Sequence, residues 1–355
     1  MMEKVLMKGN EAIAEAAIQA GCNYFFGYPI TPQNEIPAYM AKKLPKIGGV
    51  FLQAESEVSA INMVYGAAGT GARVMTSSSS PGISLKQEGI SYIAGAALPC
   101  VIVNIVRGGP GLGGIQPAQS DYFQSVKGGG HGDYHLIVYA PSTLQEMVSL
   151  TMEAFDVADI YRNPVMILGD GMLGQMMEPV EFTKPPKREL PEKTWATTGC
   201  DGSRKPNVIN SLYIDPEELE REVNKTYKKY ELIKERETRY EEYNCEEADI
   251  IVVAYGTTAR IVKSVIEMAR EKGINVGLIR PITIWPFPYA PIDKYANKKH
   301  VKSFLTVEMS MGQMVEDVRL GVNGKKDVKF YGRTGGMVPT PDGILAEIIK
   351  YVEEV

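Results

Sequence analysis

The feature that most constrains the fold is a regular alternation of short apolar runs with longer helical segments in the first half of the chain. The predicted strands lie at 23–28, 49–54, 72–79, 99–106, 135–140 and 164–170. The predicted helices between them lie at 11–21, 32–44, 56–71, 82–97 and 142–159. Strands that are apolar throughout and joined by helices are typical of a parallel sheet with helices on both faces. We therefore predict an α/β fold with an N-terminal doubly wound parallel sheet.

A second alternation begins at Asp249 and predicts another, smaller α/β unit. Its strands are expected at 249–256, 274–281, 301–310 and 327–332, and its helices at 257–273, 311–322 and 340–355. Between the two units lie a segment rich in proline and lysine and a helical segment dense in both charge signs, which indicate a surface connection. We predict an N-terminal domain at 1–185, a linker and charged helical connection at 186–246, and a C-terminal domain at 247–355.

Charge and cysteine content exclude several classes of function. The net charge of −5 gives no support to a nucleic-acid or anionic-membrane surface. The four cysteines are far apart and form no CxxC motif, which argues against a disulfide framework and against a zinc or iron–sulfur site built by this chain alone. No apolar h-region or membrane-spanning stretch is present in the sequence, so we expect a cytoplasmic protein.

Parallel sheets place their sites at the carboxyl ends of the strands, and two polar residues follow strands there. In "FFGYPITPQN" the prolines Pro29 and Pro32 make a stiff turn that presents the Thr31 hydroxyl at a strand end. Arg107 ends the strand at 99–106, and a guanidinium there could bind a carboxylate through two hydrogen bonds. A surface arginine in an ion pair explains Arg107 equally well.

Two acids and a run of hydroxyls also follow strands. Glu55 and Glu57 open a helix, where negative charge interacts favourably with the helix dipole, so a purely electrostatic role remains an alternative to a functional one. The hydroxyls of "TSSSSPG" at 76–82 could cap the next helix or line a site, and we favour capping.

Three other motifs resemble metal or phosphate sites but lack residues that such sites require. The "GDG" at 169–171 suggests a thiamine-diphosphate metal site, but the first asparagine after it is Asn207, beyond the linker, so Asp170 is predicted to be a plain strand-end turn. His131 and His135 lie in a glycine-rich segment without the glutamate of an HExxH motif, which indicates loop histidines. The glycines of "RGGPGLGG" match neither a P-loop nor a dinucleotide turn and indicate a mobile loop.

Four segments together resemble one family. They are "GYPITPQNE", "QAESEVSA", "TSSSSPGISLKQEGISYIAGAALPCVIVNIVRGGPG" and "GGIQPAQSDYFQSVKGG". In this order they are similar to the alpha-type chain of the 2-oxoacid:ferredoxin oxidoreductases, most of all the branched-chain (3-methyl-2-oxobutanoate) branch. The resemblance implies a thiamine diphosphate pyrimidine-binding domain followed by a domain like the transketolase C-terminal one.

The same resemblance implies an activity, namely oxidative decarboxylation of a 2-oxo acid with coenzyme A to acyl-CoA and CO2, with electrons passed to ferredoxin. A 2-oxoglutarate or pyruvate enzyme of the same family is an alternative. A non-catalytic assembly subunit is an alternative from another class.

The resemblance also assigns residues. Glu57 matches the glutamate that bonds the pyrimidine ring nitrogen, Thr31 the threonine that faces the substrate, and Arg107 the arginine that holds its carboxyl end. The rest of the turn, Tyr28, Pro29 and Ile30, is implied to line the cofactor. Glu55 is only two residues away from Glu57, but the spacing back from Gly66 favours Glu57.

The resemblance finally implies partners. A beta-type chain is expected to carry the Mg2+-diphosphate site and an iron–sulfur cluster, alongside ferredoxin-like and gamma subunits, ferredoxin and coenzyme A. No metal is expected on this chain itself.

Overall fold

The computed structural model describes residues 4–353 and contains a seven-stranded sheet in its N-terminal part. The order of its strands is β12-β6-β7-β5-β4-β2-β3. They are β2 (Tyr24–Gly27), β3 (Val50–Gln53), β4 (Val74–Ser78), β5 (Val101–Val106), β6 (Ile137–Tyr139), β7 (Val165–Asp170) and β12 (Thr283–Trp285). All neighbours pair in parallel except β12, which is antiparallel to β6. The predicted doubly wound parallel sheet is confirmed.

Two groups of helices cover this sheet. The elements are α1 (Gly9–Gln19), α2 (Glu35–Lys43), η1 (Leu44–Ile47), α3 (Glu57–Gly69), α4 (Ser80–Gly95), α5 (Tyr122–Val126), α6 (Leu144–Tyr161) and α7 (Gly171–Gln175). Helix α1 packs on α2 and α6, whereas α3 packs on α4. Right-handed crossovers in this strand order put the two groups on opposite faces of the sheet.

Side-chain caps explain where two of these helices begin. The Ser56 hydroxyl accepts the backbone N–H of Ser59 at the start of α3, at 3.3 Å. The Thr143 hydroxyl accepts the N–H of Glu146 at the start of α6, at 3.1 Å. Each cap satisfies a backbone donor that the helix itself leaves free, typically worth about 1 kcal/mol.

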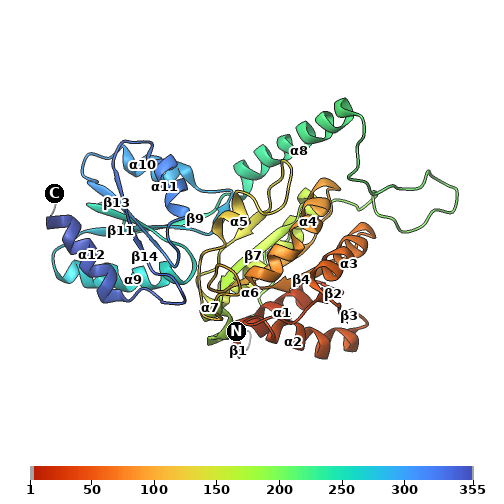
Figure 1. The fold of residues 1–355 in the computed structure, drawn as a ribbon, viewed down its shortest axis with the longest axis horizontal. Helices are drawn as coiled ribbons and strands as arrows, with labels where there is room; N and C mark the ends of the chain where they lie inside the picture. The colour runs from red at the N-terminus through yellow and green to blue at the C-terminus, as the bar shows by residue number, and fades with distance from the viewer. Residues whose placement is uncertain (1–3, 354–355) are drawn as a thin grey trace.

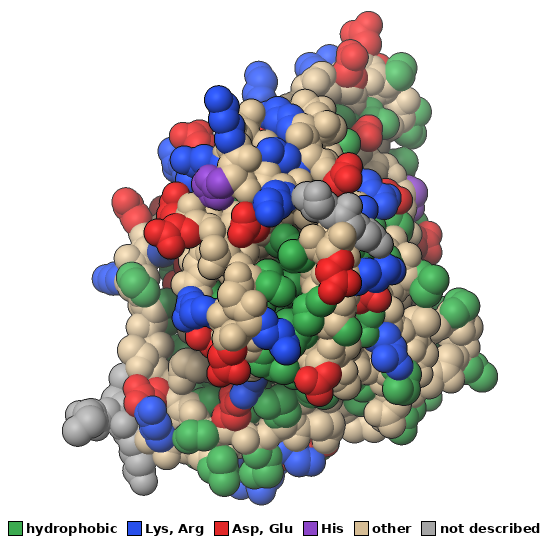
Figure 2. Space-filling view, turned by 90° about the vertical axis from the view of Figure 1, so that its left-hand side faces the viewer, with side chains coloured by type: hydrophobic (Ala, Val, Ile, Leu, Met, Phe, Trp, Pro, Cys, Tyr) green, Lys and Arg blue, Asp and Glu red, His purple; other side chains and the backbone are tan. Residues whose placement is uncertain are grey.

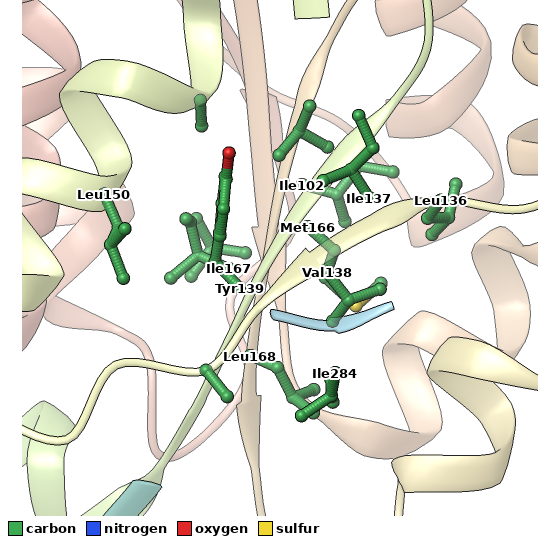
Figure 3. Close-up of a cluster of buried hydrophobic side chains, with 14 of the residues drawn as sticks. Ile102, Leu136, Ile137, Val138, Tyr139, Leu150, Met166, Ile167, Leu168 and Ile284 are labelled. Carbon is green, nitrogen blue, oxygen red and sulfur yellow. The ribbon is translucent and has the colours of Figure 1, made fainter. Parts of the chain in front are cut away.

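The core of the sheet is continuous and apolar (Figure 3). Ile102 of β5, Val138 of β6 and Met166 of β7 are fully buried, as continuous apolar strands predict. Ile284 of β12 lies in the same cluster, so a strand from far along the chain completes this core (Figure 3). Burying a side chain of this size is worth about 1.5–3 kcal/mol.

The C-terminal part holds a five-stranded sheet with the order β14-β13-β10-β11-β9. Its strands are β9 (Tyr240–Tyr243), β10 (Ile250–Val253), β11 (Val276–Pro281), β13 (Ser303–Glu308) and β14 (Asp327–Gly332). Its helices are α9 (Gly256–Glu271), α10 (Tyr289–Ala296), α11 (Met314–Val322) and α12 (Pro341–Glu353). The strands are parallel apart from β9, and the end of the helix predicted at 340–355 lies outside the described residues.

The connection between the two sheets follows the surface. Strands β1 (Val5–Lys8) and β8 (Met177–Val180) form a separate antiparallel pair. A long segment without helix or strand follows, and α8 (Pro216–Glu237) then returns along the top of the molecule (Figure 1). Since β9 joins the C-terminal sheet and β12 the N-terminal one, the chain crosses between the sheets more than once. The domain boundaries at 185 and 247 stay a prediction.

The charged side chains on one face of the molecule are mixed in sign, as the small net charge leads one to expect. On the face formed by the C-terminal part, acidic and basic side chains alternate around a central group of hydrophobic ones, and neither charge sign dominates (Figure 2). None of the helices within residues 4–353 is long and apolar enough to cross a membrane.

Candidate active site

The turn between β2 and α2 is held by hydrogen bonds to its backbone. The carbonyl oxygen of Pro32 accepts from Asn10 Nδ2 at 2.8 Å and from Gln175 Nε2 at 3.1 Å. The carbonyl oxygen of Thr31 accepts from Arg107 Nη1 at 2.9 Å. These donors hold the main chain of the turn, and the Thr31 hydroxyl adds a long 3.4 Å hydrogen bond that it accepts from Asn34 Nδ2.

The remainder of this turn is more open. Tyr28 and Pro29 are exposed and Ile30 is half-buried. The carbonyl oxygens of Tyr28 and Ile30 accept hydrogen bonds from the side chain and the backbone of Gln33. The turn therefore presents a rigid outer face next to Thr31.

Arg107 lies at the end of β5 and reaches across to this turn. Its second terminal nitrogen, Nη2, donates to the carbonyl oxygen of Leu112 at 3.2 Å. Its Nε is buried and has no hydrogen-bond partner. Among residues 4–353 Arg107 has these carbonyl partners and no ion pair, which favours the ligand-binding interpretation over the ion-pair alternative. The guanidinium is held by neutral carbonyls and retains a free donor.

The two acids after β3 differ sharply in environment. Glu57 occupies the first turn of α3 and is only 6% exposed, whereas Glu55 is exposed. Within the described chain no hydrogen bond reaches the Glu57 carboxylate. Its Oε1 packs against Gly82, where an added Cβ would lie 2.6 Å from this oxygen and 2.1 Å from Ser78 Oγ. Only glycine at position 82 leaves room for this carboxylate.

Other unpaired polar atoms lie close by. The hydroxyls of Ser78 and Ser79, at the end of β4, are buried without a partner. Ser79 is the residue before α4 but makes no side-chain cap, so the capping role predicted for the hydroxyls at 76–82 is wrong for this serine. Buried polar groups are normally bonded, and a cluster of unpaired ones at one sheet edge indicates a place for a polar ligand.

Lys86 was missed by the sequence analysis. Its side chain is fully buried on α4, and Nζ donates to Thr76 Oγ1 at 2.7 Å and to the Ser77 carbonyl oxygen at 3.0 Å. Burial lowers the pKa of Lys86 to about 7, while the nearby Glu57 carboxylate opposes this shift. One signal could have found it: Lys86 falls four residues after Gly82, on the helix face that also carries the apolar Ile83 and Ile90.

A cavity of about 690 Å³ opens beside Thr31. It is lined by Thr31, Pro32, Glu35, Ile115, Gln116, Pro117, Gly171, Met172, Gln175, Met176, Gly336 and Val338. Most of the side chains in this lining are apolar, and none is a lysine or an arginine. Both halves of the chain contribute to the wall, since Gly336 and Val338 come from the C-terminal part.

Asp170 of the GDG motif and the two histidines of the glycine-rich segment have structural roles. Asp170 Oδ1 accepts the backbone N–H groups of Met172 and Leu173 and so caps α7, and its Oδ2 accepts from Thr257 Oγ1 at 2.6 Å. His131 contacts Tyr92 edge-on, and His135 stacks on the Trp285 ring with centroids 4.5 Å apart. Among residues 4–353 no three metal-ligating side chains lie together. The hydrogen bond from Thr257 to Asp170 links the C-terminal part of the chain to the N-terminal part.

Comparison with known proteins identifies the class to which this fold and site belong. Residues 15–250 match the family model described as pyruvate flavodoxin/ferredoxin oxidoreductase, thiamine diphosphate-binding. Residues 248–344 match the pyruvate:ferredoxin oxidoreductase core domain II. A split-gene transketolase has the same fold, with a TM-score of 0.61 at 13% identity. The class is that of thiamine-diphosphate-binding oxidoreductases.

Similarity to individual proteins specifies the family within this class. Ketoisovalerate oxidoreductase subunit VorB of Methanothermobacter thermautotrophicus is 50% identical over 100% of this chain and 98% of the relative. Subunit KorA of 2-oxoglutarate synthase from the same organism is 37% identical over 99% of both. The structure of a 2-oxoglutarate:ferredoxin oxidoreductase from Magnetococcus marinus superposes with a TM-score of 0.88 at 27% identity, over 99% of this chain and 66% of that one. The chain belongs to the 2-oxoacid:ferredoxin oxidoreductases and is an alpha-type subunit of such a multi-subunit enzyme.

Proposed function

We propose that this subunit holds the aminopyrimidine ring of thiamine diphosphate in an enzyme that oxidatively decarboxylates branched-chain 2-oxo acids. The reaction would join the acyl group to coenzyme A, release CO2 and pass two electrons to ferredoxin. The observation that carries the proposal is the Glu57 side chain, which is only 6% exposed, accepts no hydrogen bond within the described chain, and has its Oε1 next to Gly82 and near the buried, unpaired Ser78 hydroxyl. A buried, unpaired carboxylate is unfavourable unless something binds it.

Glu57 is the residue we assign to the ring nitrogen of the pyrimidine. When bound, thiamine diphosphate supplies the carbon nucleophile and the electron sink for decarboxylation. Glu57 would hold a proton between its carboxylate and that nitrogen, acting as the acid–base group that activates the cofactor. Its position in the first turn of α3, opposite Gly82, leaves the carboxylate oxygens available for this bond.

Thr31 and Arg107 are the residues we assign to the substrate. The Nε of Arg107 is a free charged donor at the sheet edge, and the bonds from its two terminal nitrogens keep the guanidinium in place. The Thr31 hydroxyl is presented by a backbone that other residues hold. Such preorganised donors orient a bound substrate without moving during the reaction. Tyr28, Pro29 and Ile30 would line the cofactor on the outer side of the turn.

The cavity beside Thr31 favours an apolar substrate side chain. Ile115, Pro117, Met172 and Val338 line it, and no lysine or arginine among the lining residues could bind a second carboxylate. The 50% identical relative is named a ketoisovalerate oxidoreductase subunit. A 2-oxoglutarate or pyruvate enzyme is the alternative, and steady-state rates of the reconstituted complex with 3-methyl-2-oxobutanoate, 2-oxoglutarate and pyruvate decide between them. Faster use of 2-oxoglutarate would overturn the assignment.

The other parts of the enzyme belong to partner chains in this proposal. A beta-type subunit would bind the diphosphate through Mg2+ and carry an iron–sulfur cluster, with ferredoxin-like and gamma subunits completing the complex in the cytoplasm. The reason is that Asp170 is used as a helix cap and a contact with Thr257 and is fully buried, so it is unsuited to holding a metal.

The role of Glu57 is tested by proton–deuterium exchange at C2 of the cofactor in the reconstituted complex, measured by NMR after acid quenching. Glu57→Gln keeps the size and an amide but removes the titrating group, so exchange should slow by ~10²–10⁴-fold. Glu55→Gln is the matched control and should leave exchange close to the wild-type rate, because Glu55 is exposed. If neither change matters, the chain is an assembly subunit and this role is wrong.

A further inference from the structure

The turn between β14 and α12 brings the C-terminal part of the chain to the wall of the cavity beside Thr31. Gly336 and Val338, both in this turn, are the lining residues that come from the C-terminal part. Val338 is half-buried, whereas its neighbour Met337 is 55% exposed and does not belong to the lining. Val338 therefore contributes the C-terminal side chain that a molecule in this cavity would meet.

The turn packs directly on the segment that follows β5. A Cβ added to Gly336 would lie 2.4 Å from Gln116 Cβ, and Gly336 has a φ of +91°. A Cβ added to Gly108 would lie 3.6 Å from the backbone nitrogen of Gly336. The close approach and the left-handed backbone both require glycine at position 336. The main chain of the turn thus lies against the loop that begins next to Arg107.

Hydrogen bonds at the base of the turn hold the C-terminal part in this position. The backbone N–H of Arg333 donates to the Glu308 carbonyl oxygen at 3.1 Å. The next residue, Met309, exchanges two bonds with Gln119: its carbonyl oxygen accepts the Gln119 N–H at 2.8 Å, and its N–H donates to Gln119 Oε1 at 3.0 Å. Gln119 follows the lining residue Pro117 by two positions. One segment therefore forms part of the cavity wall and also fixes the turn that completes it.

The chemistry of the wall around Val338 is that of a pocket for an apolar group. Ile115, Pro117 and Met172 line the same cavity. A β-branched valine side chain has a restricted χ1 and forms a stiff boundary. In an apolar pocket one methylene more or less changes discrimination by about 10- to 200-fold. One side chain in such a wall is enough to decide between substrates that differ by a single carbon.

We infer that Val338 is a specificity-determining residue: the turn between β14 and α12 limits the size of the 2-oxo acid side chain that the cavity beside Thr31 accepts. The inference rests on the function proposed above, because it takes this cavity as the site of the substrate side chain. The C-terminal part then shapes the substrate site in addition to packing against the N-terminal part.

The inference is tested by kcat/KM of the reconstituted complex for three acids: 2-oxobutanoate, 3-methyl-2-oxobutanoate and 4-methyl-2-oxopentanoate, each one carbon longer than the one before. Val338→Ala makes room, so kcat/KM for the longest acid relative to 3-methyl-2-oxobutanoate should rise by about 10-fold. Val338→Leu takes room away, so kcat/KM for the shortest acid relative to 3-methyl-2-oxobutanoate should rise by a similar factor. Each variant is a test by itself, and C2 exchange without substrate shows that the cofactor site of that variant has assembled.

Met337→Ala is the matched control, because Met337 is the exposed neighbour outside the lining, and it should leave both ratios at the wild-type values. A residue that only supports the fold would lower kcat/KM for all three acids by the same factor and leave the ratios unchanged. Unchanged ratios in the Val338 variants, or a shift in the same direction for Ala and Leu, would overturn the inference.

Failure of the inference and failure of the proposed function give different results. If the wild-type complex uses the branched acids best but the ratios do not respond to Val338, the proposed function stands and the role of Val338 is wrong. If the wild-type complex prefers 2-oxoglutarate while Ala and Leu still shift the ratios in opposite directions, the branched-chain assignment is wrong and the role of Val338 stands.

Discussion

Arg107 donates a hydrogen bond from Nη1 to the backbone carbonyl oxygen of Thr31 over 2.9 Å and so ties the end of β5 to the turn after β2. The same guanidinium bonds the Leu112 carbonyl oxygen and leaves Nε free. One side chain thus holds the main chain of a second candidate site residue while its own Nε donor stays unpaired within the described chain.

Arg107→Lys tests this double role. A lysine ammonium cannot keep both carbonyl bonds and also replace the free Nε donor, since it lacks the planar fork. A hydrogen bond to a charged group is worth about 1.5–3 kcal/mol, so KM for the 2-oxo acid should rise by about 10- to 100-fold. C2 exchange without substrate should stay near the wild-type rate. If exchange falls while KM is unchanged, Arg107 acts on the cofactor instead.

Thr31→Val tests the hydroxyl alone. The turn is bonded through the carbonyl oxygens of Thr31 and Pro32, so the variant should unfold at the wild-type urea midpoint. Loss of one hydrogen bond to the substrate, worth about 1 kcal/mol, should lower kcat/KM by roughly fivefold. A variant with reduced stability and unchanged kinetics would show that the hydroxyl serves the fold.

Gly82→Ala tests the space around Glu57. The new Cβ would meet Glu57 Oε1 and Ser78 Oγ, so the carboxylate must move, and overpacking of this kind destabilises by about 1–3 kcal/mol. We expect weaker thiamine diphosphate binding by the complex in calorimetry. Gly66→Ala in α3 is the control: no atom lies within 4 Å of its Cβ, so it should stabilise the chain by about 0.5–1 kcal/mol. Equal cofactor affinity in both variants would contradict the prediction.

The buried Lys86 predicts a pH dependence of stability. Burial lowers its pKa from 10.5 to about 7 in the folded chain, so between these values the unfolded chain binds more protons. The free energy of unfolding should therefore rise with pH across this window, by up to roughly 5 kcal/mol at about 1.4 kcal/mol per pH unit. Urea unfolding at pH 6 and pH 9.5 should show that the free energy of unfolding of Lys86→Met lacks this rise with pH. At pH 6 the variant should be more stable than the wild-type chain. The same increment in both proteins would exclude Lys86 as its source.

Much of the N-terminal fold could be predicted because its signals are local. Continuous apolar runs between amphipathic helices specify a parallel sheet, and the carboxyl ends of such strands meet at one edge. The sequence therefore predicted Thr31 and Arg107 at the same edge of the sheet, and the structure shows the bond between them; Glu57 was assigned to the site by the family resemblance alone. The choice between Glu55 and Glu57 remains a prediction, although only Glu57 is buried.

The short strands β1, β8, β9 and β12 could not be predicted, because each has its partner far away in the sequence or is too short to show a period. Capping was the favoured role for the hydroxyls at 76–82, yet the hydroxyl of Ser79, the residue at the N-cap, is buried and unpaired.

The sequence by itself determined the alternation of elements and the strand ends at which polar residues occur, since both follow from residue type and local spacing. Only the tertiary structure decided which of those polar groups lost contact with water. Lys86 lies within a helix whose one acidic residue, Glu88, is bonded by Tyr92, and the Lys86 side chain is buried because α4 packs against α3 and β5. Desolvation and charge pairing depend on what surrounds a side chain in space, and neighbours along the chain do not specify that.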